Sequence, residues 1–150
     1  MTDSDVGETR RKPRRVEDLA DAYDFLEEVR LRPGMWVNRS SLQHLDSMLT
    51  GYRVALGIYD IAEPFDFWAP GSQGRFAEWL WQRLGRHSPL GWAVEIEREA
   101  EGSGRPAMEV FFELLDEFRA ADHQGRDSAK PDGHSPTETQ QAHASVSSLS

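Results

Sequence analysis

Five histidines are the first side chains to consider for acid–base or metal chemistry, and only His44 and His87 lie outside the polar C-terminal stretch. The ligand spacings His-Glu-x-x-His and Glu-x-x-His are absent, and without Cys the chain has no thiolate ligand. No Gly-x-Ser-x-Gly motif is present, so a Ser–His–Asp site would have to combine distant residues, such as Ser40 or Ser41 with His87. The sequence therefore predicts no catalytic, metal-binding or cofactor-binding residue.

The carboxylates offer a different chemistry. Glu95, Glu97, Glu99 and Glu101 alternate along the chain, and on a helix residues two apart do not face one another. We therefore expect them to spread over a solvated surface rather than to form a paired acid and base. Four further carboxylates extend this acidic field: Glu109, Glu113, Asp116 and Glu117. Such a field serves solubility alone, or it steers association with a basic protein partner.

A tryptophan pair adds a candidate anchor for a partner. Trp79 and Trp81 are two residues apart, so both cannot face inward from one helix. Trp79 shares the helical stripe of Phe76 and Leu80, which predicts that Trp79 is in the core and that Trp81 points sideways or outward, unless the preceding loop covers it. The predicted partner-binding residues are Trp81, Glu95, Glu99, Glu109, Glu113, Asp116 and Glu117.

The elements that would position these side chains show helical apolar spacing nearly throughout, which predicts an all-α fold of about five helices. The start signals are Ser40, with Gln43 three residues later, then Ser88-Pro89, and then Pro106. The predicted helices begin near residues 16, 41, 76, 89 and 106, and the first four end near residues 31, 57, 85 and 102. Residues 62–74 form a loop whose Phe and Trp side chains we expect to be pinned to the core.

Composition divides the chain into three parts. Residues 1–15 are predicted to be a disordered basic arm, residues 16–122 a single helical domain, and residues 123–150 a disordered polar tail. Residues 17–122 carry ten Arg against twenty Asp and Glu, which argues against nucleic-acid binding by the domain. No run of 18 apolar residues is present, so no membrane span is expected, and the absence of Cys suits the cytoplasm.

Two resemblances follow from short motifs. Residues 26–37, which include Arg32-Pro33-Gly34-Met35, resemble a segment near the start of the gyrase B subunit, but Asn38 replaces a Gly of that family. The ATP-site motifs of that family are missing downstream, so ATP hydrolysis is not implied. The stretch 24–120 resembles a set of small, uncharacterised bacterial helical proteins. Its matching motifs are Arg-Pro-Gly-Met, Gly51-Tyr52, Phe76 to Leu80, Gly91-Trp92-Ala93 and Phe111 to Phe118. Small acidic proteins of this kind often act as immunity partners of toxins.

The function predicted from these features is a non-enzymatic interaction domain, in concrete form an immunity or inhibitor protein that blocks a basic toxin. Its acidic last two helices would mimic phosphate charge, and Trp81 would anchor the partner. Two alternatives stay open. One is a small enzyme or ligand-binding domain in which His44 and His87 converge in a pocket. The other is a homodimeric regulator with a symmetric aromatic interface.

Overall fold

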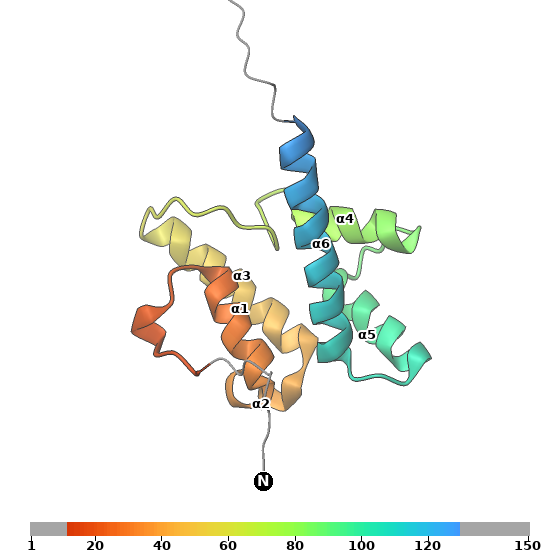
Figure 1. Cartoon of the computed structure of the whole chain (residues 1–150), viewed down its shortest axis with the longest axis horizontal. Coiled ribbons are helices and arrows are strands. Elements are labelled where there is room, and N and C mark those ends of the chain that lie inside the picture. The colour runs from red at the N-terminus through yellow and green to blue at the C-terminus, as the bar shows by residue number, and fades with distance from the viewer. Residues whose placement is uncertain (1–11, 130–150) are drawn as a thin grey trace, which may run out of the picture. The chain divides into compact units, whose positions relative to one another are not determined.

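The fold is all-α, as the apolar spacing predicted. A computed structural model describes residues 12–129, with side chains as far as residue 125 (Figure 1). Within that range the structure has no β-strand, and Ala69 and Ser72 form only an isolated bridge. Two short 3-10 helices, η1 and η2, span Val16–Asp18 and Asn38–Ser40. The α-helices are α1 Ala22–Leu31, α2 Pro33–Trp36, α3 Leu42–Ile58, α4 Arg75–Leu84, α5 Trp92–Ser103 and α6 Ala107–Ala129.

The described residues up to Phe118 form one compact unit, and those from Arg119 onward belong to a second. Helix α6 continues to Ala129, beyond the domain boundary at residue 122 that the composition predicted. A helix can extend without a core face where its residues are mostly good helix formers, as several here are. Arg14 of the predicted arm is also ordered, since its backbone N–H donates to Glu28 Oε1 at 3.1 Å. Residues 1–11 and 130–150 of the two predicted tails lie outside the described residues.

The first predicted helix is interrupted. After η1 the chain leaves helical geometry until Asp21, whose side chain accepts a hydrogen bond from Asp24 N and caps α1. Asp24 in turn accepts one from Ala20 N at 2.8 Å. These reciprocal bonds satisfy donors that a helix start leaves unpaired, so they favour a new start at Ala22 over a continuous helix.

Two predicted caps are also wrong. Ser41, not Ser40, caps α3 by accepting from His44 N, because Arg39 and Ser40 both adopt left-handed backbone geometry before the helix. Ser88 does not cap α5, which begins four residues later with Gly91 as its N-cap at φ 96°. The Ser88 hydroxyl instead accepts a hydrogen bond from Leu90 N. The turn that this bond closes leaves Leu90 54% exposed.

Phe76 of α4 is the hub of an aromatic core. The centroid of its ring lies 5.5–6.0 Å from those of five other aromatic rings: Phe67, Trp79, Trp92, Phe111 and Phe118. Figure 1 accordingly shows the first turns of α6 beside α5 and the middle of α6 beside α4. Burying each such side chain contributes about 1.5–3 kcal/mol. The core is therefore centred where the apolar stripes of α4 and α6 meet.

The loop from residue 62 to residue 74 is pinned to this core, as predicted. Phe67 is 2% exposed, and Phe76 N donates to Asp66 O at 2.9 Å. Gly74, at φ 96°, lies directly against this segment, where no larger residue fits: a Cβ there would be 2.6 Å from Asp66 O. No helix in the described part of the chain is both long and apolar enough to cross a membrane.

Candidate functional site

Glu95, predicted to lie on a solvated surface, is buried. Its exposed fraction is 2%, and its Oε2 accepts hydrogen bonds from Ser88 Oγ at 2.8 Å and Arg98 Nη1 at 3.1 Å. Arg86 Nη2 donates to the other oxygen at 3.1 Å. The hydrogen bond from Ser88, followed by those from Arg86, lowers the pKa of Glu95. Glu95 shares the α5 stripe of Trp92 and Ile96, which explains its burial, and it holds the α4–α5 connection onto α5 rather than facing a partner.

The other five predicted carboxylates are at the surface, and each is paired with an arginine of the same chain. The pairs are Glu99 with Arg86, Glu109 and Glu113 with Arg105, Asp116 with Arg30, and Glu117 with Arg83. The hydrogen bond from Arg105 lowers the pKa of Glu113, and the hydrogen bonds that Arg105 donates to Glu113 and Glu109 raise the pKa of Arg105. Exposed pairs of this kind add little to stability, because water and salt screen the attraction between the two charges. A basic partner would nevertheless meet carboxylates that already have a cation.

Of the two positions that the sequence left open for Trp81, the structure has the one covered by the preceding loop, and Trp79 packs against the core as predicted. Trp81 is buried at 9% exposure, and its Nε1 donates to Gln73 Oε1 at 3.1 Å. Trp79 is half-buried and stacks on Phe76. The buried face of α4 therefore includes both Phe76 and Trp81, because the loop before the helix, which carries Gln73, covers Trp81. Trp81 is part of the wall of a polar hollow rather than an exposed anchor.

The two histidines occupy different places. His44 is exposed on the first turn of α3, with Nδ1 3.1 Å from Asn38 O. His87 packs its ring against Trp81, 5.5 Å between centroids, in a hollow of about 540 Å³ that also contains Glu78 but not His44. Among residues 12–125, no cluster of three or more His, Asp or Glu side chains is arranged to hold a metal ion.

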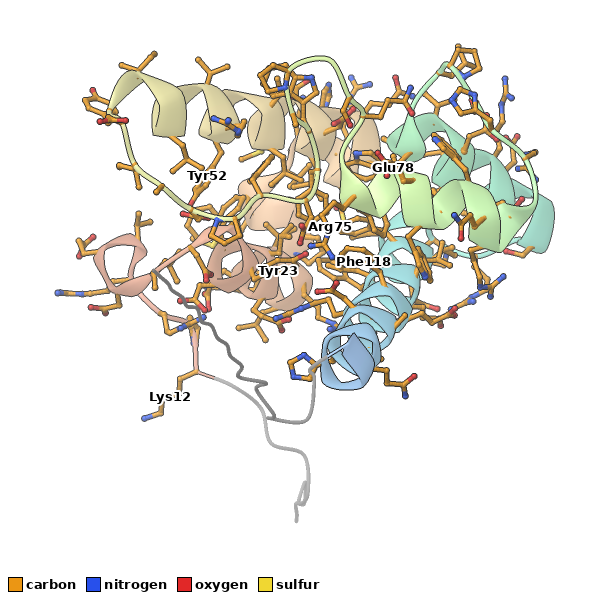
Figure 2. The ribbon with its side chains drawn as sticks, turned by 90° about the horizontal axis from the view of Figure 1, so that it is seen from above. Lys12, Tyr23, Tyr52, Arg75, Glu78 and Phe118 are labelled. Atoms are coloured by element: carbon orange, nitrogen blue, oxygen red, sulfur yellow. The ribbon has the colours of Figure 1, made fainter. Side chains whose placement is uncertain are left out.

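A buried carboxylate network joins three segments near the core. Asp66 is 8% exposed and accepts hydrogen bonds from Tyr23 Oη at 2.7 Å and Arg75 Nη1 at 2.9 Å. The Arg75 guanidinium lies 5.8 Å from the Phe118 ring centroid, and Figure 2 shows Tyr23, Arg75 and Phe118 gathered at this point. Both carboxylate oxygens and the backbone carbonyl of Asp66 connect α1, the loop and α4, so this cluster is structural.

The sequence patterns missed an exposed apolar cluster at the end of α3. It consists of four side chains with exposed fractions of 46–73%: Val54, Ile58, Tyr59 and Ile61. We call it the α3-end cluster. The apolar spacing of this helix predicts one buried stripe that consists of Leu42, Leu45, Met48 or Leu49, Tyr52, Leu56 and Tyr59. Tyr59 is instead 73% exposed. The helix ends there, with Asp60 at φ 55° and Ile61 N donating to Leu56 O at 2.8 Å, and this turn directs the chain away from the core. The available signal was that Val54 and Ile58 lie off the predicted stripe.

A groove of about 410 Å³ lies against the face of α3 that carries Met48 and Tyr52. Its walls come from η1, α1, α3 and the residues between η1 and α1: Val16, Leu19, Asp21, Phe25, Met48 and Tyr52. Tyr52 points from α3 toward the N-terminal segment (Figure 2), and its hydroxyl donates to Glu63 Oε1 at 2.7 Å. Burial, together with the charges of Glu63, Asp21 and Asp24, raises the pKa of Tyr52. The groove is therefore apolar with an acidic wall.

Compared with known proteins, the chain matches no family model, no curated protein and no solved structure. What it does is therefore inferred from its own side chains.

Proposed function

We propose that this chain is a non-enzymatic interaction domain that binds a basic protein. The observation that carries the proposal is the α3-end cluster. Ile58 and Tyr59 are 70% and 73% exposed, and Val54 and Ile61 lie beside them in the chain. Scattered apolar residues on a surface need no explanation, but a group of large ones on one helix end is typical of a protein-binding site.

Charge supports a basic partner. The chain has a formal net charge of −9 at pH 7, which attracts a cationic protein over a distance of about one Debye length and accelerates its association. The excess of acidic over basic side chains supplies this long-range field, while the α3-end cluster makes the close contacts. In concrete form the domain is an inhibitor or immunity protein of a basic toxin, and it acts by covering the toxin's cationic surface.

The proposal is tested by capturing partners with the tagged chain from its native host, in parallel with three variants. Ile58→Ser and Tyr59→Ser alter the α3-end cluster, and Leu90→Ser alters a residue of 54% exposure on the turn before α5. Removing a buried contact of this size costs about 2 kcal/mol, or roughly 30-fold in affinity. We expect the wild type and Leu90→Ser to capture one basic protein in equimolar amount, and the two cluster variants to lose it.

Two outcomes would contradict the proposal. Recovery of the same protein in equal amounts with all four chains would place its binding elsewhere on the molecule. Recovery of this chain alone, with a cluster-dependent dimer in gel filtration, would favour the homodimeric alternative.

A further inference from the structure

The groove beside α3 has the size and lining of a pocket for part of a partner. Its volume of about 410 Å³ lies in the range of pockets that hold small organic groups, and five of its six lining residues are apolar or aromatic. We propose that it receives a large apolar side chain from a cationic segment of the partner. This inference rests on the proposed function, because it names the partner's segment and the place where that segment anchors.

The groove lies on the same stripe of α3 as Tyr59 of the α3-end cluster, whereas Val54 and Ile58 lie on the other side of the helix. Met48 and Tyr52 are four residues apart, and Tyr59 follows seven residues after Tyr52, so all three lie on one stripe of α3. The stripe from Met48 to Tyr59 is roughly 16 Å long at ~1.5 Å per residue. A segment that contacts Tyr59 can therefore place a side chain in the groove at the same time.

The carboxylates around the groove are unlike the six ion-paired carboxylates of α5 and α6. Asp21 caps α1, and Glu63 accepts hydrogen bonds from Tyr52 Oη and, at 3.0 Å, from Ala22 N. Neither makes an ion pair with any residue that the structure describes. Asp24, close by, is neutralised by Arg14 at 3.5 Å. Asp21 and Glu63 are therefore free of a cationic partner in the described chain, and a lysine or arginine beside the inserted side chain would supply one.

The one arginine of α3 does not fill this role. Arg53 is directed along the helix, where its Nη1 would lie 3.7 Å from a Cβ at Gly57. Two features are thus combined at one place: an apolar groove and carboxylates with no internal arginine. That combination selects a segment that is both apolar and cationic over one that is only charged.

The test uses three labelled 12-residue peptides and fluorescence anisotropy. One peptide combines Leu and Lys in an amphipathic order, the second replaces Leu by Ser, and the third replaces Lys by Glu. The chain is used as wild type, as Met48→Trp, which fills the groove, and as Ser47→Trp, which adds the same ring at the adjacent exposed position. Amide chemical shifts of the wild type report where the first peptide binds, whether or not Met48→Trp folds.

We expect only the Leu/Lys peptide to bind, with at least about tenfold weaker binding to Met48→Trp, little change in Ser47→Trp, and shifts around Val16, Met48 and Tyr52. Equal binding of the Leu/Lys peptide to all three chains, or amide chemical-shift changes confined to α5 and α6, would contradict the proposal that the groove binds this segment. Neither result would contradict the proposed basic partner. Binding of none of the peptides would also overturn the groove, and the capture experiment with Ile58→Ser would then decide the proposed function alone. A dimer that Met48→Trp abolishes would assign the groove to a second copy and contradict the proposal.

Discussion

Gly74 provides the sharpest test of how the loop is fixed to the core. Its backbone, at φ 96° and ψ 164°, is a conformation that essentially only Gly adopts. A Cβ added there would be 2.6 Å from Asp66 O, 2.7 Å from Phe67 C and 2.8 Å from Trp68 N. These atoms are backbone, so they cannot move aside as a flexible side chain can. Gly74→Ala must therefore displace the segment that carries Asp66 and Phe67.

The chain contains its own control for this substitution. Gly91 has the same φ of 96° and ψ of 164°, precedes α5 as Gly74 precedes α4, and has no atom within 4 Å of its added Cβ. Gly91→Ala should therefore cost only the backbone strain, about 1–3 kcal/mol. Gly74→Ala should cost that strain plus the Phe76–Asp66 hydrogen bond and disturbed packing, about 3–5 kcal/mol in total. The effect of Ala on the unfolded chain is the same in both and cancels.

The measurement is urea unfolding of both variants and the wild type, monitored by tryptophan fluorescence. The free energies are compared where the three chains have the same dependence of the free energy of unfolding on urea, the slope m. We expect the free energy of unfolding of Gly74→Ala to be at least about 2 kcal/mol lower than that of Gly91→Ala. Equal values for the two variants would refute the close approach of the loop to Gly74. Because small domains are stable by only about 5–15 kcal/mol, this difference is large enough to resolve.

Three further predictions concern a turn and a charge network. Asp60→Gly should stabilise the domain by up to about 1 kcal/mol in urea unfolding, because Gly adopts the φ of 55° at the end of α3 without strain, and a loss of stability would contradict this. Glu95→Gln should lower the free energy of unfolding by about 2 kcal/mol, since Arg86, Arg98 and Ser88 lose a charged acceptor, and Glu99→Gln should change it by less than about 0.5 kcal/mol. Because the pKa of Glu95 is lowered on folding, its contribution is fully present above its ordinary value of 4.5 and is lost as the pH falls below it. Unfolding midpoints from pH 6 to pH 3 should therefore fall more steeply for the wild type than for Glu95→Gln, and parallel curves would disprove the assignment.

The helices were predictable where apolar spacing and a terminal glycine agree. Gly85, at φ 76°, ends α4 as expected, and the stripe of α6 from Met108 to Phe118 is buried as expected. Helix starts were less predictable, because several Ser and Asp residues near each start compete for the capping position. At Ser88 the competing bond is to Glu95, seven residues away, which no local pattern reveals.

The candidate site was harder to predict, because its charge balance depends on long-range pairs. Spacing along a helix can suggest that Arg105 pairs with Glu109 or that Arg98 pairs with Glu95. It cannot suggest that Arg30 pairs with Asp116, 86 residues later in the chain. Six of the eight carboxylates of the predicted acidic field therefore form ion pairs in the structure that the sequence did not reveal. The groove beside α3 depends in turn on the η1–α1 segment lying against α3, which no local spacing shows.

The measurement that tests the proposed binding surface most directly is hydrogen–deuterium exchange of the chain, free and in complex with the captured basic protein. Binding at the α3-end cluster should slow exchange of the amides from Val54 to Ile61, and an occupied groove should add protection from Val16 to Ala22. Protection confined to the carboxylate-bearing segments of α5 and α6, with unchanged exchange at the end of α3, would contradict the account.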